Sequence, residues 1–494
     1  MNRGFSGRLL LSALLSLSLL QAALAEGAKG GDANKADSLG VAITVYNQNF
    51  GLVKDVRNFD LKEGTNFVRF EDVAAAMDPT TVSFTSLTAP NSVAVREQNY
   101  QFDLMDVGTI LSKSVGKEIK VRQYTSSGTH EVTGTLLNPP NVSISDSNGN
   151  VTQHTQSIVL KTGSGIVLGA NGEIELAELP AGLVSKPSLL WKLDCDKPGT
   201  HKTEISYQTQ GLNWKCDYVA VANADDSACD MTSWVTLDNK SGATYKNAAL
   251  KLMAGDVHKV QPVMAPRAMM FKSAGMVAGG MAPQFSEQSF AEYHLYSLAN
   301  KTDVMSNETK QLTLFNASNV PVKKLYIFDS PQPYYGGGFN PGNSAGTKVN
   351  VKLEMLNSKE NNLGMPMPKG KVRVYKRDKD GAMQFVGEDL IDHTPKDEKV
   401  RVYIGDAFDL VGERKQTNFN QVSQHVQRSS MELTLKNHKE TPVTITCVEH
   451  AYGDWKVISS SQPSTKKDSH TFEFAVKVPA DGETKVTYDV ETRY

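Results

Sequence analysis

Apolar residues recur at every second position through most of this chain of 494 residues. The alternation is clearest near the C-terminus, over residues 472–478 and again over 486–490, on either side of a Pro-Ala-Asp-Gly turn. Successive side chains of a β-strand point to opposite faces, so a period of two indicates strands with one buried face. The pattern therefore predicts an all-β fold, and the length predicts several domains, at about 100–200 residues each.

The first residues predict export. Arg3 and Arg8 accompany an apolar run over residues 9–20, and Ala23-Leu24-Ala25 forms a small-x-small site. These features are typical of a signal peptide, here cleaved after Ala25. The run is shorter than the roughly 20 residues of a spanning helix, and no later stretch has about 18 consecutive apolar residues. We therefore expect a periplasmic or secreted protein without a transmembrane segment after cleavage.

Changes in strand rhythm and composition divide the chain into expected units. Short strands with tight turns in the middle of the N-terminal half predict a small closed or half-closed barrel of the SH3 or Sm type, inserted into a β-sandwich. The last segment has the size and rhythm of an immunoglobulin-like or fibronectin-like sandwich. The expected units are a signal peptide (1–25), a disordered linker (26–38), an N-terminal β-sandwich (39–102 and 187–258), the inserted barrel (103–180), a flexible Met-, Gly- and Pro-rich loop (259–290), a central β domain (291–424) and the C-terminal sandwich (425–494).

The chain has four cysteines, Cys195, Cys216, Cys229 and Cys447. An even number in an exported protein permits disulfides, so we expect at least one, with no pairing favoured. Free buried thiols and a metal site are the alternatives. No C-x-x-C occurs, and the one local pair at ligand spacing is Cys447-x-x-His450, whereas a structural zinc needs two further ligands.

The net charge of −2 and the lack of a basic block argue against nucleic acid and anionic membrane surfaces as partners. An envelope or extracellular protein is the expected partner, and the oligomeric state stays open. Trp191, Trp214 and Trp234 fall on expected strands of one region. Large aromatic side chains contribute most to a buried core, so we interpret them as core residues, with ligand stacking as the alternative.

Enzyme motifs are absent or stand in the wrong setting. The chain has no H-E-x-x-H, and its G-x-S-x-G at 342–346 lies in a Gly- and Asn-rich loop instead of between a strand and a helix. Glu449, His450 and Asp454 are weak catalytic candidates, since His titrates near neutral pH. On a strand, however, Glu449 and His450 point to opposite faces.

Two further segments carry polar or soft side chains. Asp392-His393 and the charged run over 396–399 are interpreted as a solvated loop. Met264, Met269 and Met270 in the expected flexible loop are weak candidates for copper(I), which prefers thioether ligands, but a partner-binding or plain disordered loop suits the sequence better.

Seven strings spread over nearly all of the mature chain carry a family resemblance. They are ITVYNQNFGLVKD (43–55), LNWKCDYVAVAN (212–223), LDNKSGATYKNAALKLMAGDVHKV (237–260), EYHLYSLANKTDVMSNETKQLTLF (292–315), PKGKVRVYKRDKDG (368–381), IDHTPKDEKVRVYIGDAFDLVGERKQTNF (391–419) and VEHAYGDWKV (448–457). Together they resemble DUF4139, a bacterial domain family of unknown function, to which the mucoidy inhibitor A proteins are distantly related. The resemblance implies an exported all-β protein and supplies no catalytic residue.

The leading hypothesis is an exported periplasmic or envelope-associated binding or structural protein without a cofactor. One alternative is a hydrolase-type enzyme whose site is assembled from distant residues, because catalytic groups need to converge only in space. The other is copper handling by the Met-rich loop.

Overall fold

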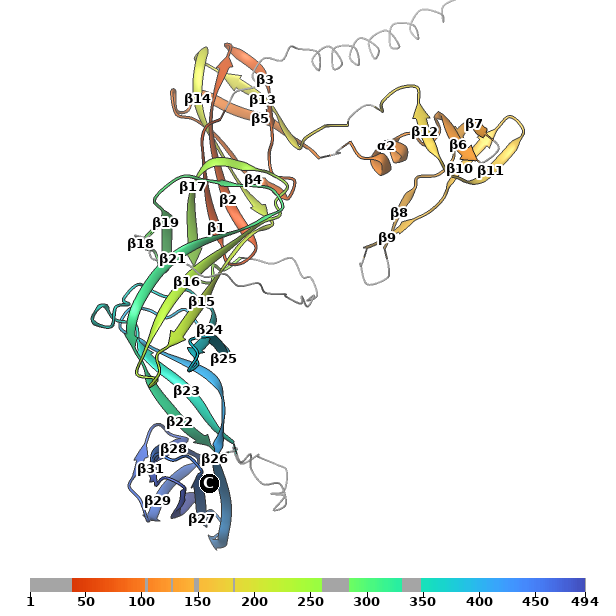
Figure 1. Ribbon diagram of the computed structural model, residues 1–494. Coiled ribbons are helices and arrows are strands. Elements are labelled where there is room, and N and C mark those ends of the chain that lie inside the picture. The colour runs from red at the N-terminus through yellow and green to blue at the C-terminus, as the bar shows by residue number, and fades with distance from the viewer. Residues whose placement is uncertain are drawn as a thin grey trace, which may run out of the picture.

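The computed structural model describes residues 38–102, 105–125, 128–145, 151–180, 183–259, 284–330 and 348–493. Within these ranges the protein is nearly all β, apart from helix α2 (Val107–Lys113) and the short 3₁₀ helix η1 (Lys359–Asn361). Several separate sheets follow one another from end to end (Figure 1). The predicted all-β, multidomain fold is confirmed. No helix in the described ranges is long and apolar enough to cross a membrane. The expected signal peptide and most of the linker lie outside these ranges.

An eight-stranded sheet and a three-stranded sheet form the N-terminal part. Trp191 lies between them, against the rings of Phe70 and Phe84 at 5.7 and 5.1 Å. The larger sheet has the order β18 (Phe285–Phe290), β19 (Tyr293–Leu298), β17 (Tyr245–Ala254), β1 (Ser38–Tyr46), β2 (Phe50–Leu61), β14 (Gly199–Gln210), β4 (Met77–Ser86), with β20 (Thr302–Val304) paired to β17, and the smaller has the order β3 (Gly64–Glu71), β13 (Ser188–Cys195), β5 (Val93–Gln101).

A five-stranded sheet continues the same core. Its inner side chains, including Tyr218, Val235 and Val372, belong to one buried cluster with those of the N-terminal sheets. The Asp380-Gly381 turn joins its last two strands as an antiparallel hairpin. The order is β21 (Glu308–Pro321), β16 (Ala228–Asn239), β15 (Leu212–Ala222), β24 (Gly370–Arg377), β25 (Met383–Ile391).

The C-terminal strands belong to a nine-stranded sheet with a second core. The sheet curls so that β31 faces β32, and the rings of Phe474 and Tyr488 lie 5.2 Å apart inside it. Strands from residues 323–356 and 399–423 are part of this sheet, in addition to those expected from 425–494. The order is β29 (Asp454–Ser460), β32 (Gly482–Arg493), β27 (Val426–Asn437), β26 (Lys399–Ser423), β23 (Lys348–Leu356), β22 (Lys323–Asp329), β28 (Val443–His450), β31 (Thr471–Val478), β30 (Ser464–Lys466). The domain boundaries themselves stay a prediction.

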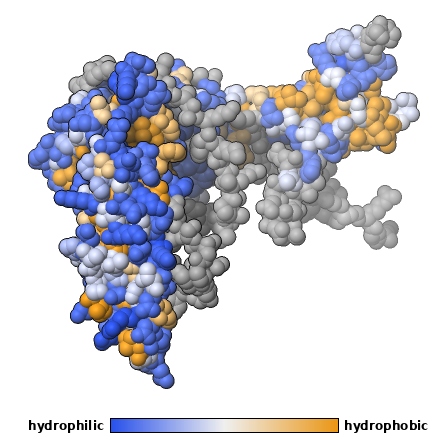
Figure 2. All heavy atoms as spheres, turned by 60° about the horizontal axis from the view of Figure 1, so that its bottom comes forward, coloured by the Kyte–Doolittle hydropathy of each residue, from blue (hydrophilic) through white to orange (hydrophobic). Residues whose placement is uncertain are grey.

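The unit expected to be a small barrel is set apart from the other sheets (Figure 1). Its described strands form an open five-stranded sheet, so of the expected closed or half-closed barrel the closed form is not present. The described residues between β7 and β10 form a two-stranded ribbon that pairs with no strand of this sheet. Hydrophobic side chains gather on the surface of this unit (Figure 2), including Ile166 and Leu168, 64% and 76% exposed. The sheet order is β11 (Gly165–Ala170), β10 (Ile158–Thr162), β7 (Gly128–Leu136), β6 (Glu118–Thr125), β12 (Glu173–Leu176), and the ribbon is β8 (Asn141–Ser145) with β9 (Val151–Thr155).

Candidate functional site

The three weak catalytic candidates do not share a site. Glu449 is fully buried in the C-terminal core, where it accepts hydrogen bonds from Arg414 Nε at 2.9 Å and Tyr488 Oη at 2.6 Å. His450 lies on the other face of β28, 2.8 Å from Asp329 Oδ1, and Asp454 is exposed at the start of β29. The predicted opposite orientation of Glu449 and His450 is confirmed, and a local catalytic dyad is excluded.

The expected disulfide is not confirmed. All four cysteines are free and buried, on β13, β15, β16 and β28. Cys216 and Cys229 lie on neighbouring strands, but the register places Cys216 opposite Val235 and Cys229 opposite Ala222. Burial raises the pKa of the Cys216 and Cys229 thiols to about 12, so both stay protonated.

The copper candidates Met264, Met269 and Met270 and the G-x-S-x-G at 342–346 lie outside the described residues. Within the described part of the chain, no group of three or more His, Cys, Asp or Glu residues is placed to hold a metal ion. The tryptophans do not converge either: Trp191 and Trp214 are buried in different sheets, and Trp234 is half-buried on β16.

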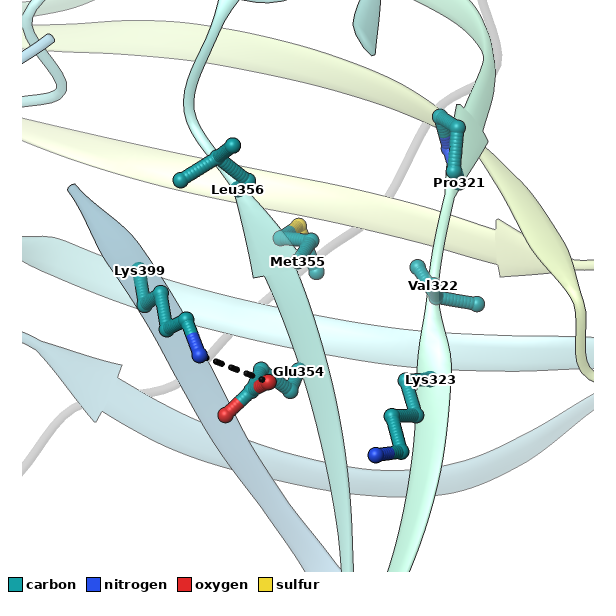
Figure 3. Close-up of a pocket in the computed structure, with 7 residues that line it drawn as sticks. All are labelled: Pro321, Val322, Lys323, Glu354, Met355, Leu356 and Lys399. Atoms are coloured by element: carbon teal, nitrogen blue, oxygen red, sulfur yellow. Dashed lines mark ion pairs between the residues drawn. The ribbon is translucent and has the colours of Figure 1, made fainter. Parts of the chain in front are cut away.

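A hollow of about 200 Å³ lies where β22 and β23 separate (Figure 3). Its lining combines the buried apolar Val322 and Met355 with the exposed Lys323 and Lys399. The Glu354 carboxylate is already occupied, because it lies 3.4 Å from Lys399 Nζ and 2.6 Å from Arg401 Nε. This hollow therefore brings together no unpaired acid and base.

A second hollow, of about 290 Å³, gathers polar side chains from distant parts of the chain. It is lined by Gln48, Asp256, Val257, His258 and Lys259. Strands β1 and β17 are parallel neighbours, with Tyr46 opposite Met253, so both strands end at the same edge of the sheet. The segments that follow them are thereby brought together. We call this feature the β1/β17 hollow.

Glycine is required where the chain leaves β17. Gly255 has a φ of +130°, and a Cβ at this position would meet the ring of Tyr293. L-residues rarely adopt such a φ, so a side chain here would cost both strain and a clash. The close approach of β19 follows from the pairing of Ala254 with His294, which brings this histidine beside the hollow.

Two more segments reach the same edge. The bridge between Met367 and Thr394 places Lys369 next to His393. Lys369 pairs through its Nζ with Asp256 Oδ1 at 2.9 Å, and its backbone N–H donates to His393 Nδ1 at 3.2 Å. The site therefore combines an ammonium, a carboxylate and an imidazole from three separate segments.

The hydrogen bonds define the state of the His393 ring. Because Nδ1 accepts from the Lys369 backbone, the proton of the neutral ring lies on Nε2, which faces the Asn47 amide at 3.4 Å. Asn47 Oδ1 is buried and has no hydrogen-bond partner among the described residues. An amide orientation with this oxygen toward Nε2 satisfies both groups.

Charge and burial keep this site in a defined ionic state. Burial and then the Lys369 cation lower the pKa of His393, against smaller opposing effects of Asp256 and Asp392. The hydrogen bond from Lys369 lowers the pKa of Asp256. At neutral pH the site thus holds a neutral imidazole beside an ion pair. Lys259 adds a second ammonium, 4.1 Å from the centre of the Phe50 ring.

This site is not predicted by the sequence pattern. The polar sequence around Asp392-His393 predicts a solvated loop, whereas His393 is half-buried and hydrogen-bonded. One signal was present: Asn47, Asp256, His294, Lys369 and His393 each fall in one of the strings that carry the family resemblance.

A protein-family model matches more than half of the chain. Residues 203–494 match the family described as Domain of unknown function (DUF4139). This match does not test the relationship to mucoidy inhibitor A proteins, which stays a prediction. No curated protein matches the chain. The chain therefore belongs to the DUF4139 family.

Proposed function

We propose that this protein is an exported periplasmic or envelope-associated binding protein that holds a small zwitterion, such as an amino acid or a dipeptide, in the β1/β17 hollow. The observation that carries the proposal is the convergence of Asp256, Lys259, Lys369 and His393 at one edge of the N-terminal sheet. A volume of about 290 Å³ is at the small end of the range for ligand pockets, roughly 300–1,000 Å³.

The charges of the hollow favour a ligand with both signs of charge. Asp256 pairs with Lys369 through Oδ1 and is 67% exposed at its side chain, so its carboxylate can also accept from a ligand ammonium. The Lys259 ammonium donates to Gln208 Oε1 at 3.1 Å and has further hydrogens to donate to a ligand carboxylate. Lys369 holds Asp256 in place, and His393 holds the Lys369 backbone. Groups fixed before binding lose little conformational entropy when the ligand arrives.

The test is a thermal-shift screen of amino acids and dipeptides. A ligand that binds only the folded protein raises Tm by mass action. We expect Asp256→Asn and Lys259→Gln each to weaken binding at least tenfold, while the matched control Lys323→Gln binds as the wild type does. No shift with any zwitterion, or equal shifts in all variants, would contradict the proposal.

Export is supported by the signal-peptide pattern of residues 1–25. N-terminal sequencing of the mature protein should give Glu26 as the first residue. The protein should be found in the osmotic-shock fluid or in the envelope fraction. A chain that keeps Met1 and stays with the cytosolic fraction argues against export.

A hydrolase-type enzyme is the second candidate, and the β1/β17 hollow favours it over the other described surfaces because its acid and base groups converge. The base would be the His393 imidazole, whose lone pair on Nδ1 must first release the Lys369 backbone N–H before it can accept a proton. In this case His393→Gln abolishes turnover of a dipeptide but keeps its binding. Copper handling by Met264, Met269 and Met270 stays a further proposal, and an unchanged Tm with copper(I) would count against it.

A further inference from the structure

The five-stranded sheet with the order β21-β16-β15-β24-β25 has one face outside all three buried cores. Its inner face carries residues such as Tyr218 and Val372, which belong to the large core. The alternate residues point the other way, among them Asp217, Trp234 and Arg373, and none of these is part of a core cluster. We call this surface the Trp234 face.

Trp234 differs from the other tryptophans in its indole N–H. Trp191, Trp214 and Trp455 each donate this hydrogen to a side-chain or backbone oxygen at 2.6–3.1 Å. Trp234 is half-buried, and its N–H makes no hydrogen bond to the described residues. A large ring with an unused donor is suited to stack on a ligand and to hydrogen-bond it as well.

A row of polar side chains crosses the whole sheet beside this ring. Gln311 on β21 donates to Thr236 on β16 at 3.3 Å, and Thr236 donates to Asp217 on β15 at 3.1 Å. Asp217 also accepts from Arg373 on β24 at 3.2 Å, and Arg373 lies 3.3 Å from Glu388 on β25. Asp217 is directly opposite Trp234 in the β15–β16 register. The donors and acceptors are thus held in place before any ligand binds.

A second aromatic group lies farther along the same face. Tyr375 pairs with Val221, four residues along β15 from Asp217, which is about 13 Å at about 3.3 Å per residue. Its ring contacts that of Phe385 at 5.6 Å between centroids. Two aromatic groups with a polar row on one sheet face suit an extended ligand of alternating apolar and hydroxyl surface.

We propose that the Trp234 face binds a linear oligosaccharide. The C–H face of a pyranose ring packs on an indole, and its hydroxyls pair with carboxylate, amide and guanidinium groups. A nucleic acid is disfavoured, because Asp217 and Glu388 lie in the row and the chain has a net charge of −2. This inference is independent of the β1/β17 hollow, and either can fail alone.

The test is calorimetric titration of the full-length protein with cellohexaose, chitohexaose and an oligogalacturonate, which separate neutral, N-acetylated and acidic glycans. We expect saturable binding of at least one, weakened at least tenfold by Trp234→Ala. Trp234→Phe should bind with intermediate affinity, because it keeps a ring and loses the N–H. The control Phe408→Ala removes a 98% exposed ring from β26 and should bind as the wild type does.

Melting curves show whether each variant is folded, and Trp234→Phe serves in place of Trp234→Ala if the latter unfolds. Absence of binding to all three glycans overturns the proposal, as does unchanged affinity in both Trp234 variants. A concentration-dependent dimer that both variants abolish also overturns it, because the face is then an interface between copies of this chain.

Discussion

Arg414 pairs with the fully buried carboxylate of Glu449 in the C-terminal core. Arg414→Met leaves this charge without its cation, so we expect a loss of about 3–5 kcal/mol in the free energy of unfolding. The double variant Arg414→Met/Glu449→Met should recover part of this loss, since the buried charge is gone. Arg428→Met, at the more exposed pair with Glu491, should cost at most about 1 kcal/mol. Urea denaturation measures the free energy of unfolding of all three variants. Equal losses for Arg414→Met and Arg428→Met would contradict the special cost of leaving the Glu449 charge buried without its cation.

Burial predicts the reactivity of the thiols. Cys195, Cys216, Cys229 and Cys447 are free and enclosed by the cores, and the pKa of Cys216 and Cys229 is raised to about 12. We expect an aromatic disulfide reagent to modify no thiol of the native protein and four thiols in guanidinium chloride without reductant, since the thiolate is the reactive species. Two or fewer thiols in the denatured protein would show that a disulfide is present.

His393 gives the stability a specific dependence on pH. Its folded pKa lies below the ordinary value of about 6.5, so the unfolded chain binds more protons in this window. Stability should therefore be fully present above about pH 6.5 and decline as the pH falls below it. The glutamine side chain of His393→Gln does not titrate. The Tm of this variant should therefore fall by less than that of the wild type when the pH is lowered from 7.5 to 5.5. Parallel Tm curves for the two proteins would contradict this assignment.

Strand β26 joins the two large cores. Val400 and Val402 lie in the first core and Leu410 in the second. The strand passes so close to β25 that a Cβ on Gly387 would meet the backbone carbonyl of Ile404. Gly387→Ala must push β25 and β26 apart, and we expect a destabilisation of about 1–3 kcal/mol.

Gly40→Ala is the matched control for this substitution, because a Cβ there meets no atom within 4 Å. Chemical denaturation of both variants tests the contact. If Gly387→Ala is as stable as Gly40→Ala, β25 and β26 do not need this close approach.

The elements themselves follow from local pattern, but their pairing does not. The alternation over 472–478 and 486–490 predicts two strands, and β31 and β32 are present. These strands pair with β28 and β27 instead of with each other, because the turn between them carries the chain from one layer of the core to the other. Period-two patterns define which side chain faces inward, whereas pairing depends on contacts distant in sequence.

The candidate site cannot be predicted from local sequence pattern either, because its residues are also brought together by contacts distant in sequence. Asp256 and His393 are brought together by the parallel pairing of β1 with β17 and by the bridge at Met367. No short motif contains them, and each taken alone is an ordinary loop residue. The opposite orientation of Glu449 and His450, in contrast, can be predicted from sequence, because it depends only on the two-residue period of one strand.

At the scale of the whole molecule, the described residues form two large cores in series and a small third core in the unit that is set apart (Figure 1). The DUF4139 match begins at Thr203 and therefore includes Asp256, Lys369 and His393, whereas Asn47 lies before it. The β1/β17 hollow is thus formed mainly by the matched region and completed by the N-terminal strands.

The central claim is that the β1/β17 hollow is occupied in the envelope, and histidine footprinting tests it most directly. Carbethoxylation of His258, which lines the hollow, is compared with that of His425, an exposed residue between β26 and β27. We expect His258 to be several-fold less modified in intact cells than in purified, dialysed protein, with His425 unchanged and the difference abolished by Asp256→Asn. Equal modification of His258 in cells and in the purified protein would contradict the claim.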